Sequence, residues 1–143
     1  EMKKQNLVFI ISLVCAFGFL SSFAFADVAQ RAVKIIKPAH KAVVSSPVEI
    51  CMEVYDLVVE PAKNGVNEGK GHHHLMVDIN LPSSFGMAKA LAKDSKYIHM
   101  GDGSSCKTLT LRTGRHFIRT LFARGNHVPY DPPISDVIVI DVK

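Results

Sequence analysis

The segment HHHLMVDINL, residues 72–81, alternates apolar and polar side chains after a run of three histidines. Alternation with a period of two is typical of a β-strand that has one face in a core and the other face outward. The predicted inward set is His73, Leu75, Val77, Ile79 and Leu81. The predicted outward set is His72, His74, Met76 and Asp78. The segment therefore predicts a strand that presents two histidines on its outward face.

Six further segments have strand character, and turns rich in glycine, proline, asparagine and serine separate them. They are residues 33–37, 47–54, 96–100, 106–112, 115–123 and 134–142. Seven short strands in about 110 residues predict an all-β fold, an immunoglobulin-like antiparallel β-sandwich. Residues 84–93, SFGMAKALAK, are rich in alanine and lysine and predict a short helical insertion of about two turns.

The start of the chain reads MKKQNLVFIISLVCAFGFLSSFAFA, residues 2–26, in which two lysines precede a long apolar run. This pattern is typical of a secretory signal peptide, and the closing Ala-Phe-Ala matches its cleavage site. We therefore expect residues 1–26 to be a signal peptide and residues 27–143 to form one periplasmic or secreted domain without a membrane span. An uncleaved membrane anchor is the alternative, but the small residues at positions 24 and 26 favour cleavage.

Two of the three cysteines, Cys51 and Cys106, belong to the expected exported domain. An oxidising compartment makes a disulfide between them the default. Both cysteines fall on outward faces of their strands, which argues against a bridge between the two sheets. In an immunoglobulin-like order the second and fifth strands are neighbours, so a bridge within one sheet is available. Two reduced thiols are the alternative.

The formal net charge is +4, from 17 basic and 13 acidic residues. The basic residues are dispersed singly and form no helical face. This dispersal is typical of a solvated surface, and we expect no nucleic-acid partner.

The remaining histidines can be placed from the expected topology. In a seven-stranded sandwich the loops after the second, fourth and sixth strands lie at one end. This end is expected to gather His72, His74, His99 and His127. His40 and His116 are expected at the surface, and His73 is expected to be a structural residue of the inward face.

A group of imidazoles suggests a transition-metal site, because neutral imidazole suits zinc, copper and nickel, and a thioether selects Cu(I). Met76 follows His74 on the same face and Met100 follows His99, so copper is the first expectation, with zinc as an alternative ion. A metal-free hydrogen-bond network among the imidazoles is the second interpretation. The domain would then be an interaction or structural module of the cell envelope, and the sequence does not identify a protein partner.

Catalytic motifs are lacking in the sequence. No GxSxG elbow or phosphate-binding glycine loop occurs, and the glycine-rich stretches at residues 69–71 and 101–103 are typical of turns. We expect a protein without enzyme activity. A hydrolase that uses Ser104 or Ser105 is a third interpretation, although a serine in a glycine-rich turn is typically a turn residue.

Three stretches carry a family resemblance. They are PAKNGVNEGKGHHHLMVDINLP (61–82), YIHMGDG (97–103) and LTLRTGRHFIRTLFARGNHVPYDPPISDVIVIDV (109–142). With the combined pattern GxGHHHLxxD and HxPxxPPxS, the chain resembles the exported bacterial family classed as domain of unknown function 4399. The resemblance implies a secreted all-β domain of immunoglobulin-like type with no established activity.

Carried over by motif, the resemblance matches the family's histidines to His72, His73, His74, His99 and His127, and its aspartate to Asp78. Where the family tends to have further histidines, this chain has Tyr97 and Tyr130. These departures imply fewer imidazoles for a metal site. Cys106 occupies a position that is acidic in the family, which implies a disulfide peculiar to this chain.

Overall fold

The computed structural model describes residues 30–92 and 94–143 of the chain. The signal peptide expected at residues 1–26, and cleavage before Asp27, lie outside the described residues. Within them the chain forms strands, one short α-helix and one 3₁₀ turn. The elements are β1 (Ala32–Lys37), β2 (Val43–Val44), β3 (Val48–Tyr55), β4 (Val58–Val59), η1 (Ala62–Asn64), β5 (Lys70–Val77), α1 (Ser84–Met87), β6 (Ile98–His99), β7 (Cys106–Leu109), β8 (Gly114–Ala123) and β9 (Ser135–Val142).

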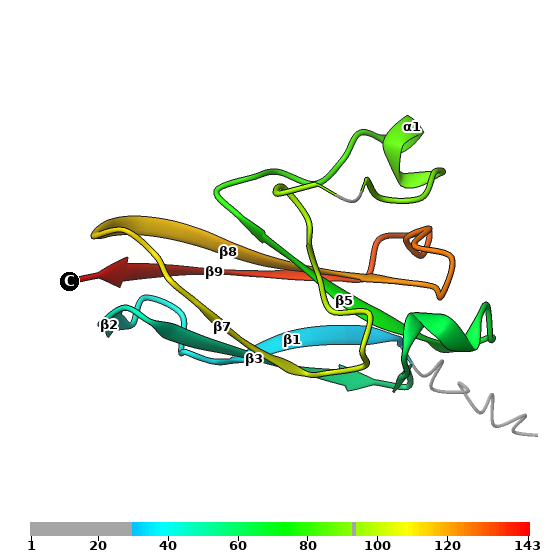
Figure 1. Cartoon of the computed structure of the whole chain (residues 1–143), viewed down its shortest axis with the longest axis horizontal. Coiled ribbons are helices and arrows are strands. Elements are labelled where there is room, and N and C mark those ends of the chain that lie inside the picture. The colour runs from blue at the N-terminus through cyan, green and yellow to red at the C-terminus, as the bar shows by residue number, and fades with distance from the viewer. Residues whose placement is uncertain (1–29, 93) are drawn as a thin grey trace, which may run out of the picture.

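The strands form two sheets, and the predicted all-β sandwich is confirmed (Figure 1). One sheet has the order β1-β3-β7 and is antiparallel throughout. The other has the order β2-β9-β8-β5-β4, with β6 also paired to β5. All seven predicted strands are present, and the two-residue strands β2 and β4 add short parallel pairs at the edges of the larger sheet.

The main core lies between the two sheets, as the alternation of apolar residues predicts. Ile50 and Met52 of β3 face Leu75 of β5 and Ile118 of β8, and all four side chains are buried. Burying such side chains contributes roughly 1.5–3 kcal/mol each relative to exposure. The two sheets are therefore held together chiefly by this apolar layer.

A second, smaller core covers the outer face of the larger sheet. Met76 of β5 and Leu121 of β8 pack there against Met87 and Leu91, which lie in the segment around α1. Figure 1 shows this segment lying over the sheet on the side away from β1 and β3. The outward face predicted for residues 72–78 is therefore covered by the chain itself over part of its length.

Two details of the predicted third strand are wrong. The strand ends at Val77 because Asp78 adopts a left-handed conformation, with φ of 56°. This turn reverses the expected alternation, so Ile79 and Leu81 pack against the second core and not in the main core.

The predicted helix at residues 84–93 is shorter than expected. Helix α1 covers only Ser84–Met87, and the Ser83 hydroxyl accepts a hydrogen bond from the backbone N–H of Gly86. The N–H of Leu91 donates to the carbonyl of His127, at 3.0 Å, in place of the helical bond to Met87. A tertiary contact therefore replaces the second helical turn. The described residues contain no helix that is both long and apolar enough to cross a bilayer.

The predicted disulfide between Cys51 and Cys106 is present. The two residues are direct partners in the antiparallel pair β3–β7, with a Cα–Cα distance of 4.1 Å. As the alternation predicts, Ile50 and Met52 on either side of Cys51 belong to the main core, so the bridge lies on the outer face of the smaller sheet.

Candidate metal centre

Strand β5 places His72 and His74 on the outer face of the larger sheet and His73 on the inner face. The His73 side chain points toward the main core. Its ring packs edge to face against the ring of Phe122, and its Nδ1 lies 3.5 Å from Thr120 Oγ1. His72 and His74 are also buried, since neighbouring loops cover this part of the outer face. One strand thus delivers two buried imidazoles, two residues apart, to one place.

His99 joins them through strand pairing. Strand β6 runs antiparallel to β5, with His99 as the direct partner of His74, so the two side chains lie on the same face. Gly101 follows and lies directly beneath the ring, because a Cβ atom at this position would overlap the His99 imidazole. The position therefore requires glycine for the observed orientation of His99.

His127 enters from the loop between β8 and β9. It adopts a left-handed conformation, with φ of 66°, in a tight turn closed by hydrogen bonds between Arg124 and Val128 and between His127 and Arg124. A histidine in this region of backbone space is uncommon, so the surrounding turn has to hold it there. The turn also receives the N–H of Leu91, which connects it to the segment that covers the sheet.

The four rings form one compact cluster, as the topology predicts. Their centroids lie between 4.7 and 5.9 Å apart in every pairing. Ring nitrogens of His72, His74 and His99 all lie within 4.8 Å of one another, and His127 Nε2 lies 3.0 Å from His99 Nε2. At the usual Zn–N distance of 2.0–2.1 Å, two ligands of a tetrahedral ion are about 3.3 Å apart. The cluster needs a modest contraction to surround one ion.

Burial keeps the inner imidazoles neutral. It lowers the pKa of His72 from 6.5 to about 4, and the adjacent His99 and His127 act in the same direction. The pKa of His74 falls to about 3, again first through burial and then through the neighbouring imidazoles. A metal binds the deprotonated ring, so both residues are prepared as ligands at neutral pH.

Three ring nitrogens of this buried pair have no hydrogen-bond partner within the part of the chain that the structure describes: His72 Nδ1, His72 Nε2 and His74 Nδ1. Leaving a buried polar atom unpaired costs roughly 1–3 kcal/mol, and such atoms are rare in folded proteins. Each neutral ring carries one lone pair and one N–H. The donor set therefore fits a metal ion, which would accept one lone pair from His72 and one from His74.

The structure places the two methionines predicted as ligands in different apolar clusters. Met76 lies on the same face as His74 but is fully buried in the second core, with Met87 and Leu121. Met100 is buried in the main core with Leu75, on the opposite face from His74. The ring contacts and the ligand group that define the cluster are made by the four imidazoles.

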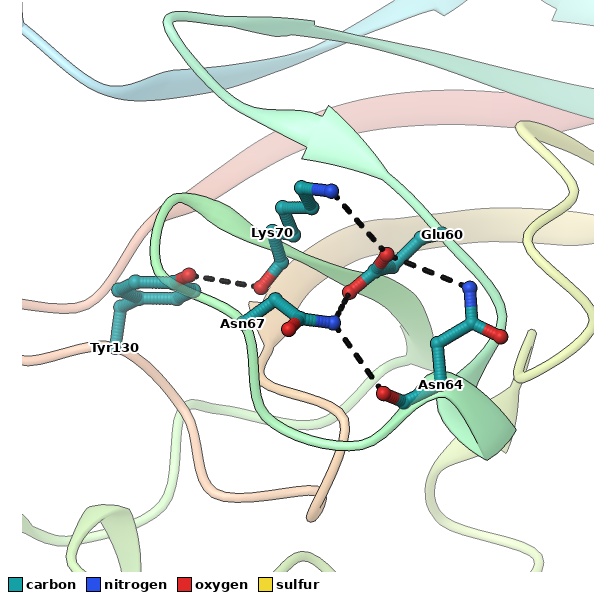
Figure 2. Close-up of polar contacts among 5 residues, drawn as sticks. All are labelled: Glu60, Asn64, Asn67, Lys70 and Tyr130. Atoms are coloured by element: carbon teal, nitrogen blue, oxygen red, sulfur yellow. Dashed lines mark hydrogen bonds and ion pairs between the residues drawn. The ribbon is translucent and has the colours of Figure 1, made fainter.

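A polar network that the sequence did not predict is centred on Glu60 (Figure 2). The carboxylate of the nearly buried Glu60 accepts hydrogen bonds from Asn67 Nδ2 at 2.7 Å and Asn64 Nδ2 at 3.4 Å, and Lys70 Nζ lies 3.7 Å away. The bond from Asn67 is the first cause that lowers the pKa of Glu60 below its ordinary value. The loop that Glu60 begins reaches the His99 turn, where Ala62 N–H donates to the Gly101 carbonyl.

His116 was predicted at the surface, and this prediction is wrong. The ring is buried, with Nδ1 2.8 Å from Asp78 Oδ2 and Nε2 2.8 Å from the Arg112 carbonyl. Only the left-handed turn at Asp78 brings that carboxylate to the ring, and no periodic pattern signals such a turn. His40 is exposed, as predicted, and its Nδ1 accepts a hydrogen bond from Val139 N–H.

Comparison with known families gives one match. The profile of a family described as a domain of unknown function (DUF4399) matches residues 50–143, which include all four histidines of the cluster. No curated protein and no solved structure gives a significant match.

Proposed function

The chain belongs to the DUF4399 family of unknown function, and we propose that it binds a transition-metal ion through His72, His74, His99 and His127. The observation that carries the proposal is the set of unpaired nitrogens on two buried imidazoles. Burial of the His72 and His74 rings without hydrogen-bond partners for these nitrogens lowers the stability of the metal-free protein. An ion that accepts their lone pairs would offset this cost.

Copper is the ion that we propose first, with zinc second. A site made of imidazoles suits both ions. Among the divalent first-row metal ions, Cu²⁺ binds most tightly to a given set of nitrogen ligands. Met76 and Met100 pack in apolar clusters, so the imidazoles alone carry the choice of ion. His99 is exposed and His127 is half-buried, so an ion could enter from this side.

The role that we propose is binding and not catalysis, in an exported protein. The Cys51–Cys106 bridge supports export, because disulfides persist in oxidising compartments. N-terminal sequencing of the protein recovered from the periplasm or medium tests this part. Export predicts a mature chain that begins at Asp27.

Metal titration by calorimetry, followed by elemental analysis, tests the binding role. The purified protein should take up one equivalent of Cu²⁺ or Zn²⁺. A His72→Ala, His74→Ala double variant should lose most of this uptake, whereas His40→Ala, an exposed histidine outside the cluster, should keep it. Absence of uptake by the unmutated protein at micromolar metal would contradict the proposal. His99→Gln, at an exposed position, tests the same site if the double variant does not fold.

The second candidate is a metal-free module in which the imidazoles connect three loops. The 3.0 Å separation of His99 Nε2 and His127 Nε2 favours it, since a neutral ring can donate to its neighbour at this distance. This candidate predicts that the double variant melts at a lower temperature by the same amount with or without a chelator. The metal-binding role predicts that the chelator lowers the melting temperature of the unmutated protein and does not change that of the double variant.

A further inference from the structure

A second group of metal-ligating atoms lies on the other side of the sandwich. Glu49 and Cys51 are two residues apart on β3, and Cys106 is the partner of Cys51 on β7. A carboxylate oxygen of Glu49 and the two Sγ atoms all lie within 4.8 Å of one another. In the oxidised protein the disulfide occupies both sulfurs, so this group holds no ion in that state.

The disulfide is open to attack from solvent. Strand β7 is the terminal strand of its sheet (Figure 1). Cys106 is exposed, whereas Cys51 is buried. An incoming thiolate can therefore reach Cys106 Sγ, and Cys51 would depart as the thiolate. The Glu49 carboxylate lies near the departing sulfur, and its ion pair with Lys37 Nζ, at 2.6 Å, offsets this negative charge.

We propose that reduction of this disulfide by a dithiol opens a second metal site, for Zn²⁺, made by Cys51, Cys106 and Glu49. One thiolate of the reductant bonds to Cys106 Sγ and the S–S bond breaks, its electron pair passing to Cys51 Sγ. The second thiol of the reductant then displaces Cys106, so the reductant becomes a cyclic disulfide and both cysteines become thiols. Binding of Zn²⁺ releases the two thiol protons.

The chemistry of the three ligands suits zinc. Two thiolates and a carboxylate bind Zn²⁺ at about 2.3 Å and 2.0–2.2 Å, and water can take the fourth position. The ion would replace Lys37 as the partner of Glu49. The site is independent of the histidine cluster, because the two groups lie on the outer faces of different sheets.

Metal titration of the oxidised and the reduced protein tests this proposal. Co²⁺ serves as a spectroscopic probe of Zn²⁺ sites, and its thiolate complexes give a charge-transfer band in the near ultraviolet. Reduction should add one equivalent of bound metal and this band. Glu49→Gln removes a direct ligand and should weaken the added binding by at least about tenfold, since the loss of an outer-shell partner alone costs this much. Glu53→Gln, at an exposed carboxylate two residues beyond Cys51, should leave it unchanged.

Three results would overturn the proposal: the same stoichiometry before and after reduction, no thiolate band, or equal effects of the two glutamate variants. Near-ultraviolet circular dichroism follows the fold, and loss of the fold on reduction would also overturn it. The comparison is made between two redox states of one protein. If the histidine cluster binds no metal, the oxidised and the reduced protein each bind one equivalent less. The difference in bound metal between the two redox states is then unchanged.

Discussion

His99 Nε2 and His127 Nε2 lie 3.0 Å apart although the residues are 28 positions apart in the chain. His99 is held by its pairing with His74, and His127 by a left-handed turn after β8. Two separate loops thus bring their imidazoles to the buried pair on β5. Metal affinity should therefore depend on the backbone that orients each of these rings.

Replacing Gly101 by alanine should weaken metal binding about tenfold, because the new Cβ would displace the His99 ring. The fold should persist, since His99 is exposed. Calorimetric titration measures the affinity, and thermal melting monitors the fold. In a His99→Gln background the same substitution should have little further effect, because both changes act on one ligand. An equal loss in both backgrounds would contradict the assigned role of Gly101.

The metal-free protein should lose stability as the pH falls from about 6.5 towards 4. The pKa of His72 and of His73 is lowered to about 4 in the folded protein, and that of His74 to about 3. Below 6.5 the unfolded chain therefore binds more protons than the folded chain, and stability decreases until the folded pKa values are reached. The total change should be on the order of several kcal/mol.

Urea unfolding in the presence of a chelator at pH 7.5 and at pH 4.5 measures this effect. His73→Leu should reduce the difference between the two pH values, because it removes one titrating ring from the core. His40→Ala is the matched control and should leave the difference unchanged. An unfolding free energy that does not vary between the two pH values would refute the buried neutral state of these rings.

The titration of His116 should change stability with pH in the opposite direction to that of the three buried histidines on β5. Both of its nitrogens face acceptors, and the bond to Asp78, followed by that to the Arg112 carbonyl, raises the pKa of His116. Its stabilisation is fully present below pH 6.5 and is lost as the pH rises through the raised value. His116→Gln should therefore destabilise the protein more at pH 5.5 than at pH 9. Chemical denaturation at both values provides the comparison, and equal destabilisation would count against this pairing.

Removal of the disulfide should lower the free energy of unfolding by about 2–4 kcal/mol, because the bridge restricts the unfolded chain. It joins residues with a sequence separation of 55. A Cys51→Ser, Cys106→Ser double variant, compared with the oxidised protein in guanidinium unfolding, measures the loss. The metal affinity of the histidine cluster should not change, since the bridge lies on the other sheet. A matching loss of affinity would show that the two sites are coupled.

Much of the fold and of the cluster could be predicted from the sequence because side chains on a strand alternate. Alternation placed His72 and His74 on one face and His73 on the other, and the order of a sandwich placed Cys51 beside Cys106. The same rule, applied to residues 98–100, separates Met100 from His99, since neighbouring residues of a strand point in opposite directions. Met100 accordingly lies in the main core.

The features that the sequence did not predict depend on single backbone conformations and tertiary hydrogen bonds. The left-handed Asp78 ends β5, moves Ile79 and Leu81 to the second core, and presents a carboxylate to His116. The bond from Leu91 to the His127 carbonyl ends the expected helix. Neither feature has a periodic signal, because each is set by one residue and a distant partner.

X-ray absorption spectroscopy of the oxidised protein loaded with one equivalent of Zn²⁺ tests the central claim most directly. The account predicts three or four imidazole nitrogens in the first shell at about 2.0–2.1 Å, and no sulfur ligand. A first shell of oxygen atoms alone, as for an ion held loosely at the surface, would contradict it.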